Sequence, residues 1–252
     1  MKKSILLLTF LTSCLQITWA QLRLSSDSGL VFNGYNDVRA PSGDSPNRGT
    51  LFSLTDDFEP QQPIAFLRLQ AAYTFSDKHT LELTAQPVRF DYEKTTNDAI
   101  ISFEGVNFST RTSPIIGRYE FDTYRFSYRY GFIRKEKTNL QIGLTVLLRD
   151  AKIALTQGDI TAENTDLGFV PLVSFLFKTT LSPRLDFRLA GDALVGPQGR
   201  AEDVFAGLEY AIIPDRFFLN AGYRIVEGGA DVDQVYSFAL FHIASIGIAS
   251  QF

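Results

Sequence analysis

The sequence predicts an all-β fold: a single antiparallel up-and-down barrel of about ten strands, preceded by a short leader. Three observations lead to this prediction. Apolar and polar residues alternate with period two in one segment after another, the pattern of strands with one apolar and one polar face. Short and long connections alternate between these segments, and no helical periodicity is evident after residue 20.

The first twenty residues have the three-part pattern of a secretory signal peptide. Lys2 and Lys3 precede an apolar run from Ile5 to Leu11, and Thr18-Trp19-Ala20 offers small residues where a signal peptidase cleaves. The run is shorter than the ~20 apolar residues that cross a bilayer. We therefore expect cleavage before residue 21 and one mature domain over 21–252.

An alternative is a lipoprotein site at Leu11-Thr12-Ser13-Cys14, with lipid attached to Cys14. Residues 21–252 contain no cysteine, which excludes a disulfide framework and thiolate metal sites. The chain has 24 basic and 28 acidic residues, and loss of Lys2 and Lys3 changes its net charge from −4 to −6. Nucleic-acid-binding surfaces are basic, so we expect no nucleic-acid partner, and the sequence indicates no metal or cofactor.

The clearest strand lies at 118–133, where Tyr124 and Phe126 share one face and Arg125 and Arg129 share the other. Its length exceeds the ~9–11 residues that a tilted strand needs to cross a membrane. The ten predicted strands lie near 22–35, 62–75, 79–92, 118–134, 140–156, 167–181, 184–195, 203–213, 216–226 and 235–251.

The connections fall into two groups. The short ones lie at 76–78, 135–139, 182–184 and 213–216, and the longer ones at 36–61, 93–117, 157–166, 196–202 and 227–234. This arrangement puts both chain ends at the short-turn end of the barrel. Two more alternating segments, 50–58 and 99–108, are either extensions beyond the membrane or crossings that raise the count to twelve. A count of eight is the other alternative.

The polar phase of the strands is rich in charge of both signs. We expect it to line a narrow lumen, while the apolar phase faces lipid. Its charged members are Arg68, Glu82, Arg125, Arg129, Arg149, Asp186, Arg188, Asp192, Glu209 and Arg224. Barrels of about eight strands are filled by side chains, whereas open channels need about sixteen, so we expect a plugged interior.

The last strand keeps Tyr236, Leu240 and Ile248 in phase with the terminal Phe252. It resembles the C-terminal signal that outer-membrane proteins present to the barrel-assembly machinery. The mature chain as a whole resembles bacterial outer-membrane β-barrel proteins, specifically small barrels with no assigned activity. The resemblance implies an outer-membrane location, with outer-membrane lipid and the assembly machinery as partners, and it implies no chemistry.

Two histidines are the candidates for catalysis, because outer-membrane enzymes use histidine as a base. His79 follows the turn at 76–78, so we expect a structural role at the short-turn rim. His242 lies mid-strand in the lipid-facing phase, unless a β-bulge turns it inward. Outer-membrane lipases place a serine two residues from such a histidine, but Ala244 stands there and Ser245 has the opposite phase. His242 is therefore only a weak candidate.

Acidic residues gather in the predicted loops, and calcium favours clustered carboxylates. They are Glu202, Asp203, Glu227, Asp231 and Asp233. Because the spacing of a calcium-binding EF-hand loop is absent, we expect ordinary solvated loops. The function that we expect is structural, adhesive or ligand-interacting, through the loops at 36–61 and 93–117. The alternatives are a passive conduit for small solutes or hydrophobic ligands, and a lipid-acting enzyme.

Overall fold

The computed structural model describes residues 21–252, apart from 45, 62–64 and 96–99. The predicted signal peptide and its alternative at Cys14 lie outside the described residues. No helix in the described part of the chain is long and apolar enough to cross a membrane.

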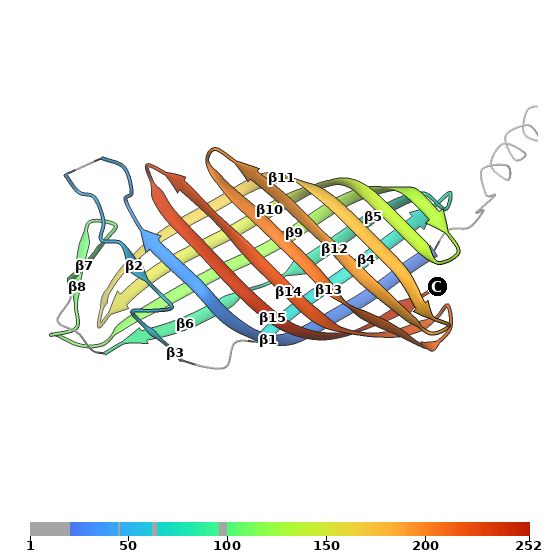
Figure 1. Ribbon diagram of the computed structural model, residues 1–252. Helices are drawn as coiled ribbons and strands as arrows, with labels where there is room; N and C mark the ends of the chain where they lie inside the picture. The colour runs from blue at the N-terminus through green and yellow to red at the C-terminus, as the bar shows by residue number, and fades with distance from the viewer. Residues whose placement is uncertain (1–20, 45, 62–64, 96–99) are drawn as a thin grey trace, which may run out of the picture.

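Ten antiparallel strands close into a long barrel, as the sequence predicts (Figure 1). They are β1 (Gln21–Arg39), β4 (Ala65–Phe75), β5 (His79–Gln86), β9 (Ile115–Lys135), β10 (Thr138–Gln157), β11 (Ile160–Ser182), β12 (Leu185–Gly196), β13 (Gly199–Ile213), β14 (Phe217–Val232) and β15 (Val235–Gln251). Each strand pairs with its neighbours in this order, and β15 returns to pair with β1.

The first and last strands close the barrel over their whole length. Their register runs from Arg23 opposite Gln251 to Arg39 opposite Tyr236. Leu22 and Phe252 extend this ladder, since the N–O distances of their two backbone hydrogen bonds are 3.1 and 2.8 Å. Lipid offers no partner to an open strand edge, so a barrel that spans a membrane requires this closure.

Three of the predicted long connections are wrong, because the strands continue through them as tight hairpins. The segments expected to be loops at 157–166, 196–202 and 227–234 are mostly strand, and their turns occupy 158–159, 197–198 and 233–234. Gly158 adopts a φ of 58° at the first turn, a conformation that favours glycine. Strands with alternating apolar and polar residues pair in water as well as in lipid. The alternation therefore does not mark where the membrane ends.

The predicted strand at 79–92 is interrupted at Pro87, which has no amide hydrogen for the ladder. It forms β5 and then β6 (Arg89–Lys94), and both pair with β9. The alternating segments near 50–58 and 99–108 lie outside the barrel. They contain β2 (Phe52–Ser53), β7 (Ile100–Phe103) and β8 (Val106–Ser109), while the short β3 (Glu59–Pro60) pairs with β6. The alternative of twelve crossings is therefore wrong.

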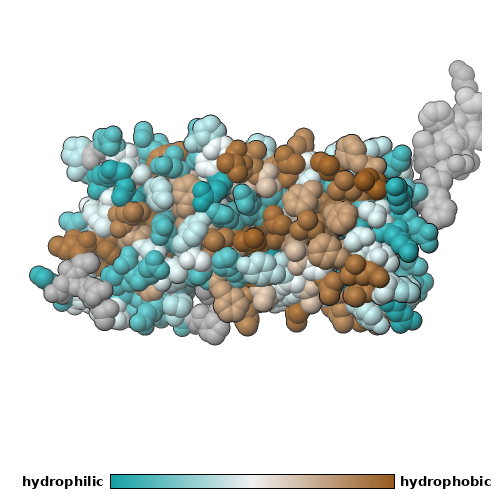
Figure 2. Space-filling view, viewed as in Figure 1, coloured by the Kyte–Doolittle hydropathy of each residue, from teal (hydrophilic) through white to brown (hydrophobic). Residues whose placement is uncertain are grey.

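The outer wall is apolar over much of its length. Leu144 is 67% exposed and Ile246 is 69% exposed, although both belong to regular strands. Figure 2 shows apolar side chains gathered over the part of the cylinder nearer the chain ends, between a polar rim and a more polar head. Such a belt on a closed barrel is the lipid-facing surface of a transmembrane protein.

The lumen contains three layers. Buried charges occupy its middle, and a polar cavity opens at the end of the barrel that contains Gln21 and Gln251. At the opposite end the inward side chains are apolar, and Phe90, Tyr119 and Phe241 pack together with ring centroids 4.9–6.2 Å apart. This apolar layer differs from the expectation of a lumen lined throughout by polar side chains.

Candidate functional site

The middle of the lumen is organised around Asp203 of β13, whose carboxylate contacts three buried guanidinium groups. Arg68 and Arg125 each donate an Nη1 hydrogen to Oδ2, at 2.8 and 2.7 Å. Arg224 donates to Oδ1. All four residues are at most 4% exposed, so the carboxylate is shared by three cations with little access to water.

These contacts run across the barrel rather than along its wall. Arg68 belongs to β4 and Arg125 to β9, and each of these strands lies four strands from β13 around the barrel. Gln86 accepts a second hydrogen bond from Arg68 at 2.5 Å, and the ring of Phe205 lies 5.3 Å from the Arg224 guanidinium. The ionic contacts therefore tie opposite walls of the lumen together.

A second buried ion pair lies nearer the chain ends. Arg129 of β9 donates to Glu82 of the adjacent β5 at 2.6 Å. Gln70 donates to the other carboxylate oxygen of Glu82 at 3.1 Å, and Ser174 lies 3.3 Å from the Arg129 guanidinium. Each charge thus has neighbours that satisfy its remaining hydrogen-bonding atoms, as a buried ion pair requires.

The structure places the predicted lumen residues on the inner wall, at different depths. Arg68, Glu82, Arg125, Arg129, Asp192, Glu209 and Arg224 are buried. Asp186 and Arg188 line the open polar cavity, and Arg149 is paired with Asp166 and shares a second, smaller pocket with Tyr119. Sequence reasoning missed Asp27, which is 4% exposed and lies 3.8 Å from Arg224.

The prediction of an acidic loop cluster is wrong in its placement. Asp203 lies deep in the lumen, and Glu202 precedes it in the same strand. Glu227 and Asp231 belong to β14, and Asp233 alone of these residues lies in a turn. The cause is the extension of β13 and β14 through segments that the sequence marked as loops.

Glu227 instead belongs to a polar cluster on the outer face. It accepts a hydrogen bond from Arg200 Nε at 2.5 Å and another from the Tyr35 hydroxyl. The Arg200 guanidinium also lies 4.8 Å from the ring of Phe238. From this cluster toward the chain ends the outer face is apolar. Tyr35, Arg200 and Glu227 therefore mark the edge of the apolar belt.

His242 faces outward, in the phase that the sequence predicts. The neighbouring strands place Phe32 and Ile225 opposite it, and both are exposed. Its Nδ1 lies 2.5 Å from the hydroxyl of Tyr223. Ser245 is buried in the opposite phase, so no hydroxyl from that residue is available to His242.

His79 lies among aromatic side chains on the outer face at the opposite end of the barrel. Its ring stacks on Phe75 with centroids 5.1 Å apart, and its Nδ1 lies 2.8 Å from the Tyr128 hydroxyl. Tyr73 and Tyr130 complete the group. Aromatic rings with a polar atom gather at membrane interfaces, which accounts for His79 without catalysis.

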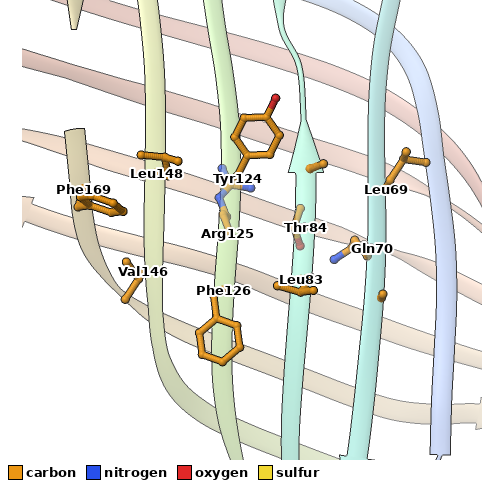
Figure 3. Close-up of a pocket in the computed structure, with 12 residues that line it drawn as sticks. Leu69, Gln70, Leu83, Thr84, Tyr124, Arg125, Phe126, Val146, Leu148 and Phe169 are labelled. Carbon is orange, nitrogen blue, oxygen red and sulfur yellow. The ribbon is translucent and has the colours of Figure 1, made fainter. Parts of the chain in front are cut away.

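An apolar groove of about 540 Å³ crosses the outer wall (Figure 3). Leu83, Phe126, Leu148 and Phe169 line it from four strands, with the small Ala85 between them. It lies within the apolar belt, and its lining residues include no outward charged side chain.

The long connections pack into a head over the far end of the barrel. Phe52, Phe58, Phe103 and Phe108 are buried there, and Phe52 lies 5.9–6.0 Å from Phe58 and from Phe103. Tyr92 of β6 is also fully buried, and its hydroxyl accepts a hydrogen bond from Asn33 at 2.7 Å. Burial raises the pKa of Tyr92 to about 12.

Polar contacts fasten the β7–β8 hairpin to the tip of β10 and β11. Gln157 donates to the carbonyl oxygens of Ser109 and Ser113 at 2.7 and 2.6 Å, and accepts from the Ser109 amide at 3.1 Å. Asn164 donates to Glu104 at 2.6 Å. The head is therefore a packed structure that adds a second cover to the lumen.

Solved structures with a similar fold are bacterial outer-membrane barrels. The outer membrane protease OmpT from Escherichia coli matches with a TM-score of 0.55 and 8% identity, over 92% of this chain and 97% of that one. The chain has the fold of a bacterial outer-membrane β-barrel. At this identity the likeness to OmpT establishes the fold of the barrel and nothing about its activity.

Two further barrels match less closely. The β-domain of the Bordetella autotransporter BrkA has a TM-score of 0.48 and 12% identity, over 93% of this chain and 100% of that one. The translocator domain of the autotransporter NalP from Neisseria meningitidis has a TM-score of 0.43 and 10% identity, over 100% and 95% of the two chains. No protein-family model matches the sequence. No curated protein matches it either.

Proposed function

We propose that this protein is a sealed outer-membrane barrel that works by presenting its packed head to partners outside the cell. Its short-turn end would face the periplasm, as in bacterial barrels with short periplasmic turns. The strand that ends at Phe252 would be read by the barrel-assembly machinery during insertion. A structural or adhesive role fits this arrangement better than transport.

One observation carries the proposal, namely the double closure of the lumen. The contacts around Asp203 join opposite walls, and the rings of Phe90, Tyr119 and Phe241 fill the next layer. A solute would have to break buried ion pairs, each with a penalty of about 3–5 kcal/mol when one partner is lost. A ten-stranded barrel is also close to the size that side chains fill.

The head supplies the binding surface. Its core is packed, yet Leu51 is 50% exposed and Ile100 is 64% exposed on its outside, and Ile160, at the β10–β11 tip to which the head is fastened, is 56% exposed. They lie beyond the charged outer ladder that includes the pairs Arg118–Asp91 at 2.7 Å and Lys152–Glu163 at 2.5 Å, so lipid does not cover them in this orientation. Exposed apolar side chains on a rigid surface are typical anchors for protein partners.

Conductance in planar bilayers tests the closure. Refolded protein should insert without producing steady current steps at moderate voltage. Regular steps of one size would contradict the sealed barrel and would favour the conduit alternative. The positive control is the same preparation with Asp203→Ala, Phe90→Ala and Phe241→Ala, which removes the hub and two rings, and this variant should conduct.

Adherence to an epithelial cell monolayer tests the head. Bacteria that express the protein on their surface should adhere to the monolayer. The combined change Leu51→Ser, Ile100→Ser and Ile160→Ser should reduce adherence about tenfold, because loss of interface hot spots costs about 1.4 kcal/mol or more. The matched control changes Lys135, Glu136 and Lys137 to serine, in the turn at the opposite end. Equal adherence of wild type and the head variant would reject the proposal.

A further inference from the structure

The lumen between the buried ion pairs and the chain ends contains a polar cavity of about 400 Å³. Its mouth lies between the turns at 183–184 and 214–216, at the end of the barrel where the C-terminus lies (Figure 1). Pockets of about 300–1,000 Å³ are the usual size of small-molecule sites. Nothing in the proposed function uses this cavity, which lies at the opposite end of the barrel from the head.

Basic side chains outnumber acidic ones in the wall of the cavity. The basic ones are Arg23, Arg129, Arg134, Lys178, Arg184 and Arg188, and the acidic ones are Glu82, Asp186, Glu209 and Asp215. Three of the four acidic groups are already neutralised. Glu82 binds Arg129 at 2.6 Å, Asp186 binds Lys178 at 3.1 Å, and Glu209 binds Arg23.

These pairs leave over Arg134, Arg184 and Arg188, and of these three Arg188 alone is partly buried. Among the described residues it has no ion-pair or hydrogen-bond partner, although it is partly buried in the inner wall. Its position in the sheet adds to the imbalance, because Lys178 stands directly opposite it in the neighbouring strand. Like charges directly opposite each other destabilise a sheet unless something offsets them.

The other neighbour of Arg188 adds no counter-charge. Gly207 stands opposite it on β13, and the ring of Phe205 covers Gly207. Arg23 and Lys178 both reach Glu209, two residues beyond Gly207, so three cations face the same part of the cavity.

We propose that this cavity binds a small oxyanion with about two negative charges, held by Arg188 together with Arg23 and Lys178. The planar guanidinium offers paired hydrogen bonds that match phosphate or carboxylate oxygens. A phosphate group could belong to a free solute or to a larger headgroup, and both present the same oxygens. The ligand enters from the end where the chain terminates, since the Asp203 contacts close the other side.

Isothermal titration with inorganic phosphate at constant ionic strength tests the proposal, on refolded protein in detergent. Wild type should bind, and Arg188→Gln should lose about tenfold or more in affinity, because hydrogen bonds to charged groups are strong. Glu209→Gln should bind more tightly than wild type, because it releases Arg23 and Lys178 for the anion. Titration with glycerol phosphate under the same conditions distinguishes a free solute from a headgroup: comparable or tighter affinity would favour the headgroup, and weaker affinity the free anion.

The matched control is Arg216→Gln, which removes an exposed arginine at the same end but outside the cavity wall. It should bind phosphate as wild type does. Heat-modifiable mobility on gels verifies that each variant is folded, and Arg188→Lys, which keeps the charge but not the paired donors, replaces Arg188→Gln if the latter fails. No measurable binding by wild type, or equal binding by wild type and the Arg188 variant, would overturn the proposal.

Discussion

Asp203 and Arg125 form a 2.7 Å ion pair across the lumen, although their strands, β13 and β9, lie four strands apart around the barrel. The pair shows how the interior is built. A carboxylate from one wall binds guanidinium groups from the others, so the same residues link the walls and close the lumen.

Removal of the carboxylate at this hub should destabilise the barrel strongly. Asp203→Asn keeps the shape of the side chain but leaves Arg68, Arg125 and Arg224 without their shared counter-charge. Loss of one partner of a buried ion pair costs about 3–5 kcal/mol. We expect a decrease of that size in the free energy of unfolding, measured by urea titration in detergent or lipid. Asp77→Asn, at an exposed turn, is the control and should change it by less than about 0.5 kcal/mol.

Gly222 should not tolerate even alanine. It stands opposite Gly207, and the ring of Phe205 lies across both, so that a Cβ at Gly222 would lie 2.5 Å from a backbone oxygen and 2.7 Å from the ring. Overpacking of this kind costs about 1–3 kcal/mol. Gly222→Ala should therefore unfold at lower urea than wild type. The control is Gly168→Ala, whose new Cβ would have no neighbour closer than 3.7 Å, and it should unfold at the same urea concentration as wild type. Equal losses of stability in the two variants would contradict this packing.

The folded state should become less stable at alkaline pH, because burial raises the pKa of Tyr92 in the head from 10.0 to about 12. Below pH 10 the tyrosine is protonated in both states and its contribution is intact. Between pH 10 and 12 the unfolded state loses its proton first, so stability falls by about 1.4 kcal/mol per pH unit. Absorbance titration should show a late tyrosine transition that is missing in Tyr92→Phe. If Tyr92→Phe instead removed a transition near pH 10, the burial of Tyr92 would be contradicted.

His242 should be dispensable for membrane lipid chemistry. It faces outward beside Tyr223, but its in-phase neighbour is Ala244 and the hydroxyl of Ser245 is buried. Cells that express His242→Ala should therefore give the same lipid mass spectrum as cells that express wild type. Acyl chains missing from the wild-type sample and restored in the variant would instead establish a lipid hydrolase.

The alternation of residues was enough to predict the barrel, its strand number and the outward phase of His242. These features could be predicted because a period of two determines which side chains share a face, whether that face contacts lipid or water. The same pattern could not locate Asp203, since polar alternation continues where strands leave the lipid and pair in water. A loop was therefore predicted where the structure has the hairpin of β12 and β13.

The apolar layer of the lumen was beyond sequence reasoning for a related reason. Phe241 and Ile243 alternate with Leu240 and His242, so both faces of β15 are apolar there. Which face turns inward depends on the register with β1 and β14. The polar contacts that unite the head, such as Gln157 with Ser109, join residues 48 positions apart and leave no local signal.

The central claim is that the apolar phase of each strand faces lipid up to a definite height. Nitroxide labels on single cysteines along β10 test it most directly, since residues 21–252 contain no other cysteine. In bilayers, labels at 144, 146 and 148 should relax with oxygen and not with a water-soluble nickel complex, and labels at 150 and 152 should show the reverse. Nickel access at 144 and 146 would contradict the account.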